Sequence, residues 1–197
     1  MKKGKVLVLM LLFVCLGLLV QAAKVEFKNM DDWGEVVGNG SWEDFKGAWI
    51  AGTATENWLG SLNTYENFIL EFDLTINGRT LVIVRSPIRD IPFYYGAGID
   101  LVSLTDVRLR RWEDGGWAPA YQHYAEIYTP YYYGETLHFK VTVQKAIATF
   151  EITNEYGDLI IEDEVDVGEF MDPGYIWLRS TSPGAESVLE NLTIEEI

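Results

Sequence analysis

The middle of the chain carries many tyrosine and tryptophan side chains, with arginines between them. Sugar hydroxyls need fixed polar partners, and sugar C–H faces pack on aromatic rings, so this composition suits an oligosaccharide. The alternative is that the aromatic residues simply cover a sheet, in which both residue types have a high propensity. Alternation along two predicted strands would place the candidate ligand-binding residues on one surface: Arg108, Arg110, Trp112, Trp117, Tyr124, Glu126 and Tyr128.

Apolar and polar residues alternate with a period of two through most of the chain, which predicts β-strands. Residues 68–76 alternate most regularly, and Asn77-Gly78 follows, the preferred pair for a two-residue type I′ hairpin. Residues 80–84 are rich in β-branched side chains and are predicted to return as the second strand of that hairpin. No window of eleven residues shows a helical period. Further strands are predicted over residues 35–37, 42–45, 49–51, 137–143, 148–153, 159–167, 174–178 and 188–194.

More than ten short strands in one domain imply two packed sheets, because a single open sheet would leave one apolar face in water. The predicted fold is therefore all-β, a two-sheet antiparallel β-sandwich of jelly-roll type. Neither a linker nor an internal repeat divides it, so residues 23–197 are predicted to form one domain.

The first 22 residues have the three-part pattern of a secretory signal peptide. Three lysines precede an apolar run over residues 6–20, and Val20-Gln21-Ala22 suits cleavage before Ala23. An uncleaved membrane anchor is the alternative, but the run is shorter than the ~20 residues that span a bilayer. We therefore expect a secreted, periplasmic or cell-envelope protein with no membrane span in the mature chain. The only cysteine, Cys15, would leave with the signal peptide.

The charge balance excludes some partners. The 197 residues include 15 Lys and Arg against 30 Asp and Glu, a formal net charge of −15. Removal of residues 1–22 takes three lysines and no acid, which leaves −18. Nucleic-acid binding needs a basic surface, so we expect no nucleic-acid partner. We interpret the acidic excess mainly as solubility for a secreted sandwich.

Several segments, in order, resemble the strands of the concanavalin A-like lectin/glucanase superfamily. The segment 65–74, YENFILEFDL, is similar to the superfamily's Y-x-N-F-x-L-x-F-D strand. The likeness extends over nearly the whole mature chain and is closest to family 16 glycoside-hydrolase-like domains, also called 3-keto-disaccharide hydrolase domains. It implies a concanavalin A-like sandwich, and a function among lectins, hydrolases and adhesion modules. The other matching segments are WGEVV (33–37), WIAG (49–52), HFKVTV (138–143), ATFEI (148–152), GYIWL (174–178) and ENLTI (190–194).

The resemblance also points to one candidate catalytic motif. Residues 164–169, EVDVGE, fit the E-x-D-x-x-E pattern of family 16 endoglucanases. By that likeness Glu164 would be the nucleophile, Asp166 would orient it, and Glu169 would be the acid/base. Retaining hydrolysis needs two carboxyls about 5–5.5 Å apart, which a strand bulge can provide. However, residues 162–169 hold five acids in eight positions, so a chance match is the favoured interpretation.

The sequence offers little for a metal or cofactor. His123 and His138 are the only histidines, and neither has the spacing of a metal site. Some members of the superfamily hold Ca²⁺, and acids are abundant here, but no calcium-loop pattern supports such a site. We therefore expect no cofactor.

Three functions stay open at this point. The first is a glycan-binding module that uses the central Trp, Tyr and Arg residues on the concave sheet. The second is a glycoside hydrolase of the family 16 or 3-keto-disaccharide type, which requires two facing carboxyls. The third is an envelope or adhesion domain that binds another protein, which requires an exposed apolar patch.

Overall fold

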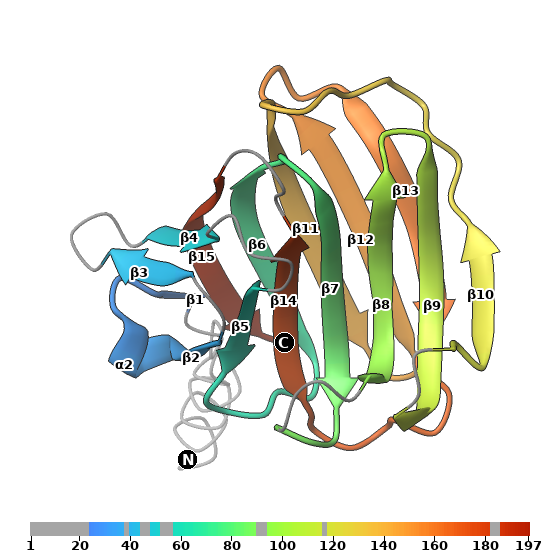
Figure 1. The fold of residues 1–197 in the computed structure, drawn as a ribbon. Coiled ribbons are helices and arrows are strands. Elements are labelled where there is room, and N and C mark those ends of the chain that lie inside the picture. The colour runs from blue at the N-terminus through green and yellow to red at the C-terminus, as the bar shows by residue number, and fades with distance from the viewer. Residues whose placement is uncertain are drawn as a thin grey trace, which may run out of the picture.

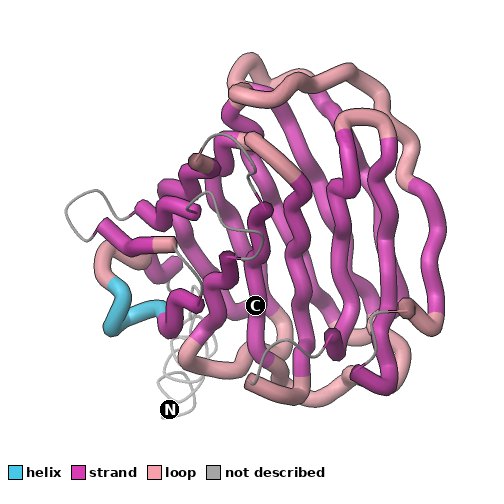
Figure 2. Tube along the Cα trace, in the orientation of Figure 1, coloured by secondary structure: helices cyan, strands magenta, loops and turns pink. Residues whose placement is uncertain are grey.

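The computed structural model describes residues 24–37, 40–43, 48–51, 57–89, 94–115, 118–181 and 186–197. The predicted signal peptide, residues 1–22, lies outside them. Within these ranges the chain is almost entirely β-structure, with one helix of four residues (Figure 2). The elements are β1 (Lys24–Glu26), α2 (Met30–Trp33), β2 (Gly34–Val37), β3 (Ser41–Glu43), β4 (Ala48–Ala51), β5 (Asn57–Ser61), β6 (Phe68–Thr75), β7 (Arg79–Ser86), β8 (Tyr94–Ser103), β9 (Asp106–Gly115), β10 (Tyr121–Tyr124), β11 (Thr136–Gln144), β12 (Ile147–Asn154), β13 (Leu159–Asp166), β14 (Tyr175–Thr181) and β15 (Ser187–Glu196).

The strands form two sheets that lie one behind the other (Figure 1). The described strands of sheet A follow the order β13-β12-β11-β6-β15-β4-β3, and β1 also pairs with β15. Those of sheet B follow the order β10-β9-β8-β7-β14-β5-β2. Neighbouring strands in both sheets run antiparallel. The two-sheet antiparallel sandwich predicted from the alternation is therefore confirmed.

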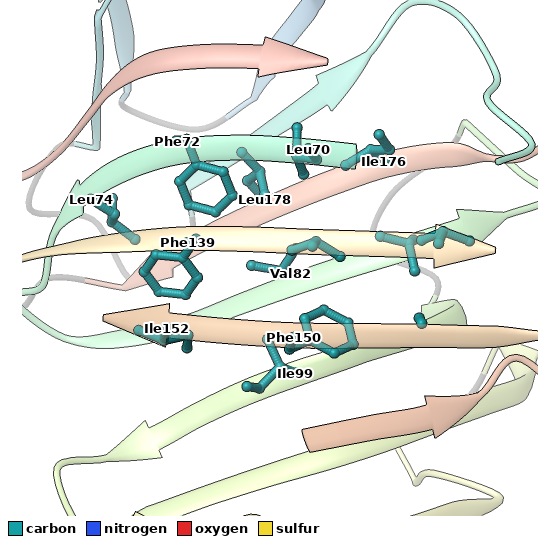
Figure 3. Close-up of a cluster of buried hydrophobic side chains, with 14 of the residues drawn as sticks. Leu70, Phe72, Leu74, Val82, Ile99, Phe139, Phe150, Ile152, Ile176 and Leu178 are labelled. Carbon is teal, nitrogen blue, oxygen red and sulfur yellow. The ribbon is translucent and has the colours of Figure 1, made fainter. Parts of the chain in front are cut away.

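The core fills the space between the two sheets, as Figure 3 shows. Strand β6 alternates buried and half-buried positions along its whole length, so one face of sheet A is sealed and the other meets water. Phe72 and Phe139, paired across β6 and β11, stack with their ring centroids 4.8 Å apart. Val82 and Ile99 of sheet B face these rings from the opposite layer.

The predicted hairpin at Asn77-Gly78 is wrong, although both of its strands exist. Strand β6 pairs with β11 and β15 in sheet A, whereas β7 pairs with β8 and β14 in sheet B. A type I′ turn needs positive φ at both central residues, and neither Asn77 nor Gly78 has it. Instead, the Asn77 side-chain amide donates to the Glu186 carbonyl, 2.6 Å away, immediately before β15. The dipeptide thus carries the chain from one sheet to the other.

A tight turn follows β12, between two strands that the alternation predicts. The side-chain oxygen of Asn154 accepts hydrogen bonds from the backbone N–H groups of Tyr156, at 3.0 Å, and Asp158, at 2.9 Å. Gly157 has φ of +83°, which glycine adopts at little cost. This turn joins β12 to β13 at the edge of sheet A.

Candidate functional site

The outer surface of sheet B carries a cluster of arginines beside one exposed tyrosine. Side chains alternate along a strand, and Leu109 of β9 lies in the core, so Arg108 and Arg110 point to the opposite, outer side. Arg108 pairs in register with Tyr124 of β10 and with Asp100 of β8. We call the outer surface formed by Arg79, Asp100, Asp106, Arg108, Arg110 and Tyr124 the arginine face.

Asp100 lies at the centre of this face and is fully buried. Its Oδ1 accepts a hydrogen bond from Arg79 Nε at 2.8 Å, and its Oδ2 accepts one from Arg79 Nη2 at 2.5 Å. Arg110 adds an ion pair from Nη1 to Oδ2 at 2.9 Å. These hydrogen bonds raise the pKa of Arg79, whereas burial lowers the pKa of Arg110 against the attraction of Asp100. Both side chains remain cations, because arginine stays protonated in proteins.

Arg108 is held in the same way by Asp106, two residues away on the same strand. Its Nε donates to Asp106 Oδ1 at 2.7 Å, and its Nη2 donates to Oδ2. The hydrogen bond from Arg108 lowers the pKa of the Asp106 carboxyl, and the positive charges of Arg110 and Arg79 act in the same direction. The guanidinium also lies over the Tyr124 ring, 5.1 Å from its centroid.

A cluster of mostly aromatic side chains lies beside the arginine face, on the same side of sheet B. Arg108, Arg110 and Trp112 do alternate onto one side of β9, but Trp112 is only 1% exposed. It packs against Tyr94, with ring centroids 5.5 Å apart. The expectation that Trp112 offers an open ring to a ligand is therefore wrong, because this ring packs against its neighbours. The cluster comprises Trp58, Leu81, Ile83, Tyr94, Trp112 and Trp177.

Two other predicted ligand-binding residues, Glu126 and Tyr128, lie elsewhere. Strand β10 ends at Tyr124, so Glu126 and Tyr128 do not continue its alternation, contrary to the prediction. The Tyr128 backbone N–H donates to the carbonyl of Ile160, in β13, at 2.9 Å. The chain thus crosses from sheet B to sheet A, and Glu126 and Tyr128 are exposed on this crossing. Trp117 lies outside the described residues.

The geometry does not support the candidate catalytic motif. Glu164 and Asp166 are exposed on β13, the edge strand of sheet A, on the side away from the core that Val165 joins. Glu169 lies beyond the end of that strand in an exposed turn, after Gly168, whose N–H donates to Asp166 at 2.7 Å. A retaining pair needs both carboxyls directed at one bond. This placement favours the interpretation of the match at Glu164, Asp166 and Glu169 as a chance one.

Both histidines lie at half-buried positions beside a carboxylate. His123 Nε2 lies 2.9 Å from Asp163, and His138 Nδ1 lies 2.9 Å from Asp73. In the described part of the chain, no group of three His, Cys, Asp or Glu side chains could hold a metal ion. Across the same ranges, no helix is long and apolar enough to cross a membrane.

Sequence reasoning missed Arg79 and Asp100. Arg79 follows the Asn-Gly pair and was hidden by the hairpin interpretation, which assigned its strand to the wrong sheet. Asp100 interrupts an apolar stretch between Ile99 and Leu101, and an acid in such a strand must be paired when it is buried. That interruption was the available signal.

The fold is of the concanavalin A-like, lectin-type β-sandwich class, as comparison with solved structures shows. Carbohydrate-binding module CBM66 from Bacillus subtilis matches with a TM-score of 0.54 at 20% identity, covering 89% of this chain and 96% of that one. A legume lectin-like domain from Entamoeba histolytica matches with a TM-score of 0.60 at 13% identity, covering 88% and 97%. The exoplasmic/lumenal domain of VIP36 in its Ca²⁺-bound form matches with a TM-score of 0.59 at 10% identity, covering 83% of each chain. No family model and no curated protein matches this sequence.

Proposed function

We propose that this protein is an exported carbohydrate-binding module that holds a poly- or oligosaccharide against the arginine face. The observation that carries the proposal is the pair formed by Arg108 and Tyr124. Tyr124 is 65% exposed, and the Arg108 guanidinium lies over its ring. A pyranose could stack its C–H face on the ring while its hydroxyls accept hydrogen bonds from the arginine.

The fixed positions of Arg108 and Tyr124 favour a binding role over incidental exposure of the two side chains. Asp106 fixes Arg108 by two hydrogen bonds, and the cross-strand register fixes Tyr124 beside it. A ligand therefore pays little to order these side chains, because the sheet has already placed them. The face lies on regular strands rather than on loops, which also favours a precise site.

The solved structures of similar fold support the class of ligand. CBM66 is a carbohydrate-binding module, and the VIP36 domain has been solved with Ca²⁺ and Man3GlcNAc. The signal-peptide pattern of residues 1–22 supports export. The proposed contacts come from the arginine and tyrosine side chains of this face, which the two aspartates hold in place.

The proposal is tested by affinity electrophoresis through gels that contain soluble polysaccharides. The variant Arg108→Ala, Tyr124→Ala removes one cation and one tyrosine from the arginine face. A matched control, Lys140→Ala, Tyr156→Ala, removes the same two types from sheet A and its β12–β13 turn, where Tyr156 is 81% exposed.

We expect the natural chain and the control to be retarded equally, and the arginine-face variant to be retarded at least tenfold less. Equal retardation of all three proteins would contradict the assignment of the site. Absence of retardation by a broad set of polysaccharides would contradict the function itself and leave a protein partner as the better hypothesis.

A further inference from the structure

The arginine face has the opposite sign from the rest of the molecule. Three arginines, Arg79, Arg108 and Arg110, surround two carboxylates, Asp100 and Asp106. The face therefore carries a formal net charge of +1, in a chain whose net charge is −15. The hydrogen bonds to Asp100 raise the pKa of Arg79 and burial lowers the pKa of Arg110, and in both cases the nearby positive charge of Arg108 opposes protonation, so the three cations lie within electrostatic range of one another.

Two of these arginines retain an accessible edge. The side chain of Arg79 is 35% exposed and that of Arg108 is 25% exposed. In each, Nε and Nη2 donate to the local aspartate, so the Nη1 group takes no part in that pair. The aspartates thus orient both guanidinium groups and partly neutralise their charge. The Nη1 group of each arginine is not used in these pairs with the aspartates.

The third arginine lies deeper. Arg110 is 7% exposed, and its Nε finds no hydrogen-bond acceptor among the described residues, nor does the buried indole N–H of Trp112 beside it. Buried donors without acceptors are costly. Arg110 therefore adds its positive charge to the face, but at 7% exposure it offers a ligand much less surface than Arg79 or Arg108.

We infer that the ligand of this face is an acidic saccharide whose sugar units carry carboxylates, such as a polyuronate. This inference rests on the proposed function and narrows its substrate class. A planar carboxylate accepts paired hydrogen bonds from a planar guanidinium, a geometry that a neutral hydroxyl does not match. Because the chain as a whole is strongly acidic, it repels an anionic polymer. The positive arginine face would therefore also determine where the polymer docks.

The inference is tested by titrating the full chain with polygalacturonate and with the same polymer after methyl esterification of its carboxyls. Esterification removes the charge and leaves the sugar backbone unchanged. We expect at least tenfold tighter binding of the free acid at low salt, and a loss of most of that preference at high salt.

Two variants locate the effect. We expect Arg108→Gln to weaken polygalacturonate binding about tenfold, because one charge-assisted contact is lost. We expect Arg108→Lys to recover only part of the affinity, since lysine keeps the charge but lacks the planar fork. The control Lys140→Gln removes a cation from sheet A and should bind as the natural chain does. Thermal melting of each variant verifies folding.

The outcomes separate this inference from the proposed function. Equal binding of the acid and the ester, with both weakened by Arg108→Ala, Tyr124→Ala, overturns the inference and leaves the proposed function standing. Tighter binding of a sulfated galactan than of polygalacturonate overturns the choice of carboxylate. Failure to bind either polymer or any neutral polysaccharide overturns both.

Discussion

Asp100 accepts two hydrogen bonds from Arg79 at the centre of the outer surface of sheet B, and no part of Asp100 is exposed to solvent. A buried carboxylate is stable only when it is paired, and this one is shared between two cations from neighbouring strands. The same ion pairs that stabilise the sheet therefore orient the arginines that we propose to meet a ligand.

Replacement of Asp100 should be strongly destabilising. Asp100→Asn leaves Arg110 buried beside a neutral group, and breaking one partner of a buried ion pair costs about 3–5 kcal/mol. Urea denaturation measures this loss. The control Asp106→Asn breaks the more exposed pair with Arg108 and should cost much less, because exposed ion pairs contribute little. Similar losses from the two variants would contradict the structural role assigned to Asp100.

The aromatic cluster beside the arginine face depends on a glycine. A Cβ added at Gly60 would come within 2.1 Å of the Trp177 ring, on the neighbouring strand. We expect Gly60→Ala to destabilise the protein by about 1–3 kcal/mol through overpacking. In a Trp177→Leu background the same change should cost less, so a double-mutant cycle measures the contact. Strict additivity would show that the clash does not exist.

Alkaline solutions should weaken the fold through Tyr131. Its side chain is buried, its hydroxyl donates to the Ser103 carbonyl at 3.1 Å, and burial raises its pKa. In the unfolded chain a tyrosine ionises near pH 10, so above about pH 10 the unfolded state binds fewer protons than the folded state. The free energy of unfolding should then fall as the pH rises.

The variant Tyr131→Phe isolates this effect. At neutral pH it should cost about 1 kcal/mol, because one buried hydrogen bond is lost. Above pH 10 its stability should fall less steeply than that of the natural chain, as measured by urea denaturation across a pH series. Parallel slopes for the two proteins would exclude Tyr131 as a source of the alkaline sensitivity.

The sequence predicted the sandwich because alternation records which side of each strand is buried. Strand β6 shows this clearly, and its predicted boundaries differ from the observed ones by one residue. Strand pairing was harder to predict. Asn77-Gly78 has the residues of a tight turn, yet its conformation depends on contacts with Glu186 and Ser187, more than a hundred residues away.

For the candidate site, too, the alternation along a strand was informative, whereas the packing against residues distant in the sequence could not be predicted. Alternation placed Arg108, Arg110 and Trp112 on one side of β9, but it could not tell that Trp112 packs against Tyr94 while Arg108 remains accessible. The predicted closeness of Tyr124 to Arg108 is correct, because the two residues pair across β10 and β9. Glu126 and Tyr128 do not join them, because β10 ends at Tyr124 and the chain then crosses to sheet A. The roles of Arg108, Arg110 and Tyr124 in binding remain predictions.

The location of the ligand is the central claim, and mapping of backbone amide chemical shifts tests it most directly. Isotope-labelled protein would be titrated with the oligosaccharide that retards it most strongly. We predict shifts concentrated at Arg79, Asp100, Arg108 and Tyr124 of sheet B, with little change along β11, β12 and β13 of sheet A. Shifts concentrated on sheet A, with the arginine face unchanged, would contradict the account.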